Sequence, residues 1–234
     1  PKQIGLVGHS EGGMIAPMAA VESKDIAFIV MMAGLGVKGD QLILSQNELL
    51  SKAGGLSEEA RAQSRLLYTR IFAILKEEKD NTVAGKKIQA ALAEALGKMT
   101  EEQKQGFAPI KAVVDAQTGM YVTPWFRYFV LYDPRPILMK VKCPVLAING
   151  ERDLQVEPDE NLAGIRDALK AGGNEDYTII KLSGLNHLLQ TSKTGAVSEY
   201  RAIEETMSVT ALETISDWIL NHTVALKGAA PRAK

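Results

Sequence analysis

The fold of this chain is decided by residues 4–20, which read IGLVGHSEGGMIAPMAA. The apolar start predicts a buried strand, the glycine-rich centre a sharp turn, and the small apolar residues that follow a helix. A strand that turns straight into a helix strains the backbone at the apex, so we expect Gly8 and Gly12 to flank Ser10 without side chains that would collide. The Ser10 hydroxyl is then exposed as a candidate nucleophile. The alternative is a serine that merely caps the following helix.

A serine nucleophile needs a base, because the neutral hydroxyl attacks a carbonyl poorly until its proton is removed. The sequence has three histidines. His9 is adjacent to Ser10, so its side chain leaves the turn on another side; we expect it to pack or hydrogen-bond beneath the turn and to border the substrate pocket. His222 follows the last predicted helix, where histidine is typical of an exposed C-terminal cap.

The remaining histidine, His187, is the predicted base. It comes shortly after the strand-like run YTIIKL at residues 177–182. Open α/β sheets place their active groups in the loops that leave the C-terminal ends of strands. The alternative is a histidine whose hydrogen bonds are satisfied locally.

The acid that orients the base is predicted at Asp153. It follows PVLAIN at residues 144–149, a short apolar run typical of a strand buried on both faces. A carboxylate beyond the end of that strand could accept the second imidazole proton and stabilise the imidazolium. Three nearby acids are alternatives that read more simply as solvated or helix-start residues: Glu151, Glu157 and Asp159.

These segments resemble the three catalytic loops of serine hydrolases of the α/β-hydrolase superfamily. The sequences GHSEGG at 8–13, GERDLQV at 150–156 and GLNH at 184–187 stand in the order nucleophile, acid and histidine that is usual in that fold. The resemblance implies an acyl-enzyme mechanism without metal or organic cofactor. The triad that it implies is Ser10, Asp153 and His187.

Finer features resemble bacterial carboxylesterases of the EstD-like kind. They are YDP at 132–134, KCPV at 142–145 and the pair Asn186-His187. The resemblance implies that the substrate is a small-molecule carboxylic ester and that the backbone amide of Glu11 is one donor of an oxyanion hole. A peptidase or a thioesterase of the same fold is the alternative.

Beyond the first helix, strand and helix patterns alternate, which predicts the α/β-hydrolase fold with a mostly parallel sheet. Residues 36–136 instead carry helical patterns without a convincing strand, and we expect them to form a cap over the active site. Core segments are therefore predicted at 1–35 and 137–223. The last segment, 224–234, reads as a disordered tail.

The cap is predicted to supply aromatic contacts to the substrate. Aromatic residues crowd into 121–134, and Trp125 and Phe126 are the pocket candidates because they follow Pro124. Large rings of defined shape suit a pocket for an acyl or alcohol group. They also suit the joint between cap and core, which is the alternative.

The turn at Ser10 lies close to the start of the 234 residues. In the resembled fold it follows the fifth strand of the sheet, so we expect the earlier strands and a second oxyanion donor to be missing from this sequence. The predicted partner at the exposed sheet edge is that N-terminal part of the hydrolase or another chain. The alternative function is a non-catalytic fragment that acts only as an associating module.

Composition excludes some other classes. The chain is 46% hydrophobic and 24% charged with a formal net charge of -1, which is typical of a soluble globular protein, cytoplasmic or secreted. This balance gives no electrostatic reason to expect nucleic acid or an anionic membrane as partner. No apolar run reaches the roughly 20 residues of a membrane helix.

Overall fold

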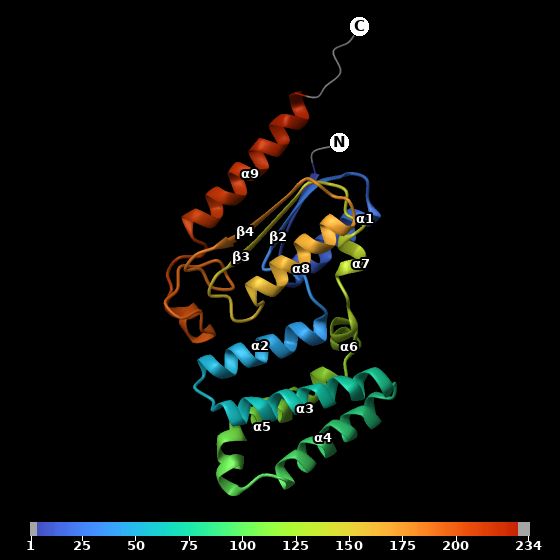
Figure 1. The fold of residues 1–234 in the computed structure, drawn as a ribbon, viewed down its shortest axis with the longest axis vertical. Helices are drawn as coiled ribbons and strands as arrows, with labels where there is room; N and C mark the ends of the chain where they lie inside the picture. Colours follow the sequence, from blue (N-terminus) through green and yellow to red (C-terminus); the bar gives the residue numbers. More distant parts are fainter. Residues whose placement is uncertain (1–3, 229–234) are drawn as a thin grey trace. The chain divides into compact units, whose positions relative to one another are not determined.

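The structure, a computed structural model, describes the backbone of residues 4–228 and the side chains of residues 4–223. The described chain forms two compact units, one made of residues 4–37 and 134–228 and the other of residues 38–133. The first unit contains the sheet and the second is helical (Figure 1). Within the described range, no helix is both long enough and apolar enough to cross a membrane.

The sheet of the first unit has four parallel strands in the order β1-β2-β3-β4 among the described residues. The strands are β1 Ile4–His9, β2 Ile26–Met32, β3 Val145–Gly150 and β4 Tyr177–Leu182. Their C-terminal residues lie in register, since His9 pairs with Met32 and Met32 with Ile148. Because all strands run the same way, the loops that follow them meet at one edge of the sheet.

Helices cover both faces of this sheet (Figure 1). On one face, Ile29 and Met31 of β2 share a core with α1, α7 and α8. On the other, Phe28, Val30 and Met32 share a core with α9. This alternation follows from the two-residue period of a strand, and it explains why the strands are apolar on both faces. The bounds are α1 Glu11–Glu22, α7 Arg135–Leu138, α8 Pro158–Ala171 and α9 Val209–Gly228, with a short 3-10 helix η1 at Val197–Ala202.

The second unit is a helical insertion between β2 and β3. It comprises α2 Gly39–Ala53, α3 Glu58–Glu77, α4 Asn81–Gly97, α5 Glu101–Tyr121 and α6 Pro124–Leu131. Side chains of Ser57, Asp80, Thr100 and Thr123 accept a backbone hydrogen bond at the start of the helix that each precedes, which fixes where four of these helices begin. Apolar faces meet in a core of their own that includes Ile71, Ile88 and Phe107.

The predicted fold class is confirmed. A parallel sheet, a strand-turn-helix unit at Ser10 and a helical insertion correspond to the C-terminal part of an α/β-hydrolase fold. Within the helical insertion, the aromatic run after Pro124 forms α6, because proline at the first helical position favours a helix start. One local prediction differs from the structure. The closing helix, expected to end at residue 221, continues to Gly228.

That longer helix also corrects the predicted tail. Residues 224–228 are helical, whereas the sequence analysis places the start of a disordered tail at 224. The rest of that segment, residues 229–234, lies outside the described residues.

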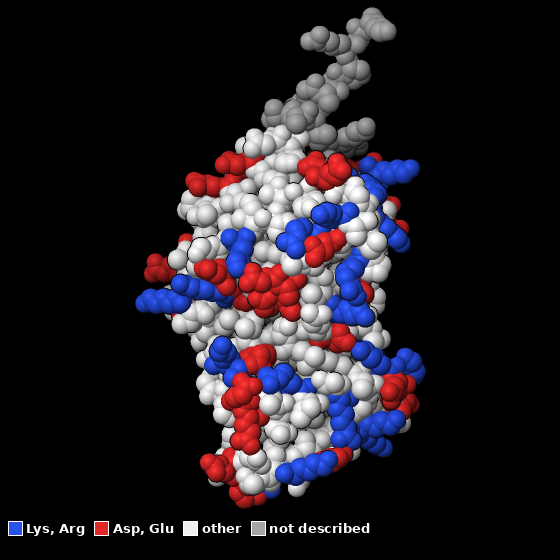
Figure 2. Space-filling view, in the orientation of Figure 1, with Lys and Arg blue, Asp and Glu red and all other residues white. Residues whose placement is uncertain are grey.

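On the visible face in Figure 2, side chains of both charge signs are interspersed. Ion pairs among the described residues include Lys181 with Asp159, at 2.7 Å between Nζ and Oδ1.

Candidate active site

Ser10 occupies the apex between β1 and α1 in a strained conformation. Its φ is 55° and its ψ is -114°, a region that residues with a side chain rarely adopt. Two backbone hydrogen bonds hold the apex: the Ser10 amide donates to the Met32 carbonyl at 2.8 Å, and the Ser10 carbonyl accepts from the Gly13 amide at 2.9 Å. Within the described chain, the Ser10 side chain makes no capping hydrogen bond to α1. The helix-cap alternative therefore has no geometric support.

Two glycines make this turn possible, and one of them differs from the prediction. A Cβ on Gly8 would lie 2.0 Å from the Gly12 carbonyl oxygen, so Gly8 is required as expected. A Cβ on Gly12 would meet no heavy atom of the described residues within 4 Å. The expectation that Gly12 avoids a collision is wrong. Gly13 has that role instead, because its Cβ would lie 2.7 Å from the Cα of Gly34.

Asp153 and His187 form a buried pair at the C-terminal edge of the sheet. Asp153 Oδ2 lies 2.8 Å from His187 Nδ1, and the two side chains are 0% and 7% exposed. The other carboxylate oxygen accepts the backbone amides of Gln155 at 2.8 Å and Val156 at 2.9 Å. A carboxylate accepts, so His187 donates from Nδ1 and its neutral form carries the lone pair on Nε2. That tautomer is the one a general base requires.

The other acids near Asp153 have different partners. Glu151 Oε2 accepts the Ser183 hydroxyl at 2.7 Å and the Gly184 amide at 2.9 Å, and these bonds lower the pKa of Glu151. Glu157 caps α8 by accepting the Glu160 amide at 2.6 Å. Asp159 pairs with Lys181. Of the four carboxylates considered, Asp153 is the one that bonds to His187.

The turn that carries His187 is held by Asn186, a residue that the sequence analysis names beside His187 without assigning it this role. Its fully buried side chain accepts the amides of Leu188 and Gln190, both at 3.0 Å, and donates to Gln190 Oε1 at 3.0 Å. Leu189 has a positive φ of 58°. The turn thus stores strain that the Asn186 amide offsets with three hydrogen bonds. The spacing of Asn186 and Gln190, four residues apart around the histidine, is the signal that could have revealed it.

His9 lies against His187. Its Nε2 is 2.7 Å from the His187 carbonyl oxygen, and the two ring centroids are 4.8 Å apart. Burial lowers the pKa of His9 below its ordinary value of 6.5. The same residue borders an open hollow of about 520 Å³ whose apolar lining includes Met32, Leu188 and Met207. His9 thus donates a hydrogen bond to the His187 loop and also borders this hollow.

His222 is not an exposed helix cap. It lies within α9, where Nδ1 donates to the Trp218 carbonyl at 2.7 Å and the ring stacks on the Trp218 indole at 3.9 Å between centroids. Its Nε2 is 3.3 Å from Asp176 Oδ1. The prediction of a terminal cap was wrong because α9 continues beyond it. The hydrogen-bond partners of His222 are thus Trp218 and Asp176, and neither lies in the loop of Asp153 or of His187.

The remaining site candidates differ in exposure. Glu11 is the first residue of α1, so its backbone amide belongs to the helix N-terminus beside Ser10. Trp125 is 48% exposed and stacks on Phe129 at 5.6 Å. Phe126 is 3% exposed and packs on Tyr121 at 5.0 Å in the core of the helical unit. Of the two aromatic candidates, Trp125 thus presents a ring to solvent and Phe126 supports the core behind it.

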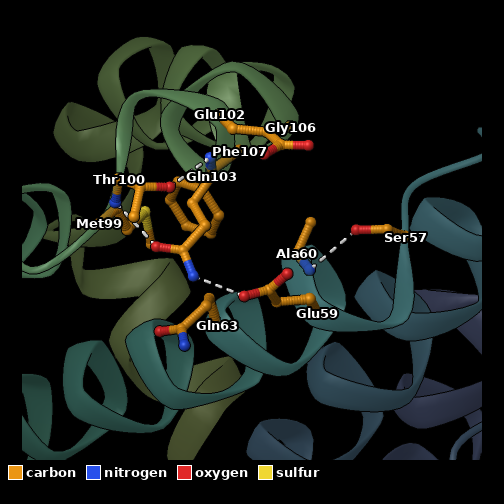
Figure 3. A pocket seen from close by; sticks show the side chains of 10 residues that line it. All are labelled: Ser57, Glu59, Ala60, Gln63, Met99, Thr100, Glu102, Gln103, Gly106 and Phe107. Carbon is orange, nitrogen blue, oxygen red and sulfur yellow. Dashed lines mark hydrogen bonds between the residues drawn. The ribbon is translucent and has the colours of Figure 1, made fainter.

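The helical unit has a hollow of its own, of about 420 Å³, between the starts of α3 and α5 (Figure 3). Gln103 spans it by donating to Glu59 Oε1 at 2.5 Å while completing the capping box with Thr100. Phe107 forms its apolar side. No group of three or more His, Cys, Asp or Glu side chains in residues 4–223 is arranged to hold a metal ion.

Comparisons with known proteins give structural similarity only. No protein-family model and no curated protein matches the chain. A proline iminopeptidase from Mycobacterium smegmatis is 16% identical with a TM-score of 0.48, over 96% of this chain and 67% of that one. A putative non-heme bromoperoxidase from Mycobacterium tuberculosis is 15% identical with a TM-score of 0.39, over 95% and 67%.

A third structure is a meta-cleavage product hydrolase from Pseudomonas fluorescens, 13% identical with a TM-score of 0.42, over 95% of this chain and 66% of that one. The chain therefore spans about two thirds of the length of these structures.

Proposed function

We propose that the chain is a serine hydrolase of the α/β-hydrolase superfamily that cleaves carboxylic esters through an acyl-enzyme intermediate. The observation that carries the proposal is the backbone of Ser10, with φ 55° and ψ -114° at a strand-to-helix turn. Strain of this kind persists only where the surroundings enforce it, and here Gly8 and Gly13 are packed to enforce it. A serine held there without capping its helix is arranged as a nucleophile.

In the proposed mechanism, His187 Nε2 takes the Ser10 hydroxyl proton while Oγ attacks the ester carbonyl carbon. The Glu11 amide donates to the oxyanion of the tetrahedral intermediate, a type of interaction worth about 10²- to 10³-fold in rate. The intermediate collapses, the C–O bond breaks, and the alcohol leaves with the proton from His187. Water then attacks the acyl-enzyme by the same route and releases the acid and Ser10.

Asp153 supports both halves of this cycle. Each time His187 becomes an imidazolium, the buried carboxylate at 2.8 Å stabilises the positive charge. Its second oxygen is held by two backbone amides, so the acceptor remains oriented toward Nδ1. The imidazole therefore keeps Nε2 available to the proton of Ser10 and to that of water.

The substrate is proposed to be a small ester, as in the EstD-like carboxylesterases that the sequence resembles. In the first unit, His9 borders an apolar hollow. In the second unit, considered by itself, Trp125 offers an exposed indole packed on Phe126. Peptidase and thioesterase activities use the same three residues. Comparing kcat/KM for matched ester, thioester and amide substrates decides among them, and we expect the ester to be preferred.

Steady-state hydrolysis of short p-nitrophenyl esters tests the proposal, with the Ser10→Ala variant as the matched control. We expect turnover by the unmodified chain and none above background in Ser10→Ala, because Ser10 supplies the nucleophile in the proposed mechanism. Equal turnover by the two proteins would remove Ser10 from the mechanism. Circular dichroism of both proteins shows that the comparison is between folded chains.

A second candidate function is association through β1. In the described sheet β1 lies at an edge, and two of its apolar side chains, Ile4 and Val7, are 46% and 52% exposed. An unpaired strand edge with apolar side chains can pair with another strand, either from an N-terminal part of the hydrolase or from another chain. Light scattering tests this: a clean monomer for the purified chain would contradict association between copies.

A further inference from the structure

His9 connects the strand that carries Ser10 to the loop that carries His187. It is the last residue of β1, directly before Ser10, and its Nε2 lies 2.7 Å from the His187 carbonyl oxygen. The two residues are 178 positions apart in sequence. This side-chain hydrogen bond joins the turn at Ser10 to the His187 loop, whereas the Asn186 bonds stay within that loop.

The bond fixes which ring nitrogen of His9 must carry a hydrogen. A carbonyl oxygen can only accept, so His9 Nε2 carries a hydrogen and donates it. Burial disfavours the charged imidazolium and lowers the pKa of His9, so the ring is neutral at pH 7. The nearby ionisable side chains are His187 and Asp153 beside it and Glu204 and Glu205 at the hollow that it borders.

Neutrality at this position matters for the neighbouring ring. The His9 and His187 centroids are 4.8 Å apart. His187 must become positively charged when it takes the Ser10 proton, and a second positive charge at that distance would oppose it. A neutral donor holds the His187 backbone without that repulsion. Lysine or arginine could make the same hydrogen bond but would bring the charge.

We propose that His9 is a positioning residue for His187: by donating from Nε2 to the His187 carbonyl it sets the base against the Ser10 turn. This inference rests on the proposed serine hydrolase function. It differs from a role for His9 in contacting substrate. A positioning residue acts on the proton-transfer step and lowers kcat when it is lost, whereas a substrate contact acts mainly on KM.

The kinetic test compares His9→Leu, which keeps bulk but removes the donor, with His9→Gln, whose side-chain N–H can reach the same carbonyl. His222→Gln is the matched control, because that histidine bonds to Trp218 and Asp176 and to neither Ser10 nor His187. We expect kcat for ester hydrolysis to fall about tenfold in His9→Leu with KM changed less than about twofold, the size of one lost hydrogen bond. His9→Gln should recover most of kcat. An unchanged kcat, or a loss confined to KM, overturns the proposal.

A second readout does not depend on turnover. Long-range 1H–15N NMR spectra report the tautomer of each imidazole, and with three histidines each signal is assigned by the substitution that removes it. We expect His9 as the Nε2–H tautomer and the His187 Nδ1 proton protected from exchange. That protection should fall at least tenfold in His9→Leu and return in His9→Gln. Unchanged protection in His9→Leu overturns the positioning role, whereas an inactive wild-type chain with the expected spectra overturns the hydrolase proposal alone.

Discussion

Asp153 Oδ2 and His187 Nδ1 lie 2.8 Å apart, both almost fully withdrawn from solvent. The hydrogen bond joins loops that leave neighbouring parallel strands, β3 and β4. A buried carboxylate whose three contacts are all donors is arranged to accept, and it fixes which imidazole nitrogen carries the hydrogen. Several consequences of this and the related contacts can be measured.

The first prediction concerns Asp153→Asn. The amide can present an N–H toward His187 and stabilise the wrong tautomer, so we expect kcat for ester hydrolysis to fall by about 10⁴-fold with little change in fold. Asp159→Asn is the matched control, because this exposed carboxylate pairs with Lys181 on the surface. A similar loss of activity in both variants would contradict the assignment of Asp153.

The second prediction concerns the glycines of the turn. Gly8→Ala places a methyl group 2.0 Å from the Gly12 carbonyl oxygen and should lower the free energy of unfolding by about 2 to 3 kcal/mol. Gly12→Ala adds the same methyl group where the described structure is open and should stabilise the first turn of α1 by up to about 1 kcal/mol. Urea unfolding measures both. Equal changes in the free energy of unfolding for Gly8→Ala and Gly12→Ala would show that the turn is not packed as described.

The third prediction concerns acid stability. Because burial lowers the pKa of His9 below 6.5, the unfolded chain takes up a proton there before the folded chain does. The stability from His9 is complete above about pH 6.5 and is lost as pH falls toward the folded pKa. The free energy of unfolding should therefore decrease more steeply from about pH 6.5 to 5 in the wild type than in His9→Gln. Urea titrations at each pH measure the free energy of unfolding. The same dependence on pH in the wild type and in His9→Gln would refute this prediction.

The fourth prediction separates activity from stability at Asn186. Asn186→Ala leaves the amides of Leu188 and Gln190 without their buried acceptor and should cost about 2 to 4 kcal/mol. Asn174→Ala is the matched control. Its side chain donates to the carbonyls of Val141 and Cys143 and accepts the Asp176 amide, away from the proposed triad.

After correction for the folded fraction, we expect kcat to fall about tenfold in Asn186→Ala and to stay near wild type in Asn174→Ala. The reason is that Asn186 holds the turn of His187, whereas Asn174 holds the approach to β3 and β4. If the two variants lose activity only in proportion to their stability, Asn186 has a purely structural role.

Much of the fold could be predicted because the local signals are strong. Residues 177–182 form β4 with the predicted bounds. The sequence of residues 158–171 is typical of a helix, and these residues form α8. An apolar run between turn residues identifies the strand, and an acidic start with a glycine stop identifies the helix. The helix α6 has a weaker signal, because a dense aromatic run has no clear polar face and only Pro124 at its first position marks its start.

The candidate site residues follow from the sequence more readily than their contacts do. Glycines, an apolar strand and chain order indicate Ser10, Asp153 and His187 as candidates. The bond between His9 and the His187 carbonyl joins residues 178 positions apart, and no local pattern encodes it. The turn that Asn186 holds includes a positive φ at Leu189. Leucine rarely adopts this conformation, so its presence in a sequence does not predict the turn. Such features arise from tertiary packing.

Covalent labelling of Ser10 tests the central claim most directly. A fluorophosphonate probe reacts with a serine that a neighbouring base has activated, whatever the natural substrate. Intact-mass measurement and peptide mapping of the labelled chain should show one adduct on Ser10, strongly slowed in His187→Gln and absent in Ser10→Ala. A folded wild-type chain that takes no label at Ser10, or that labels equally fast in His187→Gln, would contradict the account.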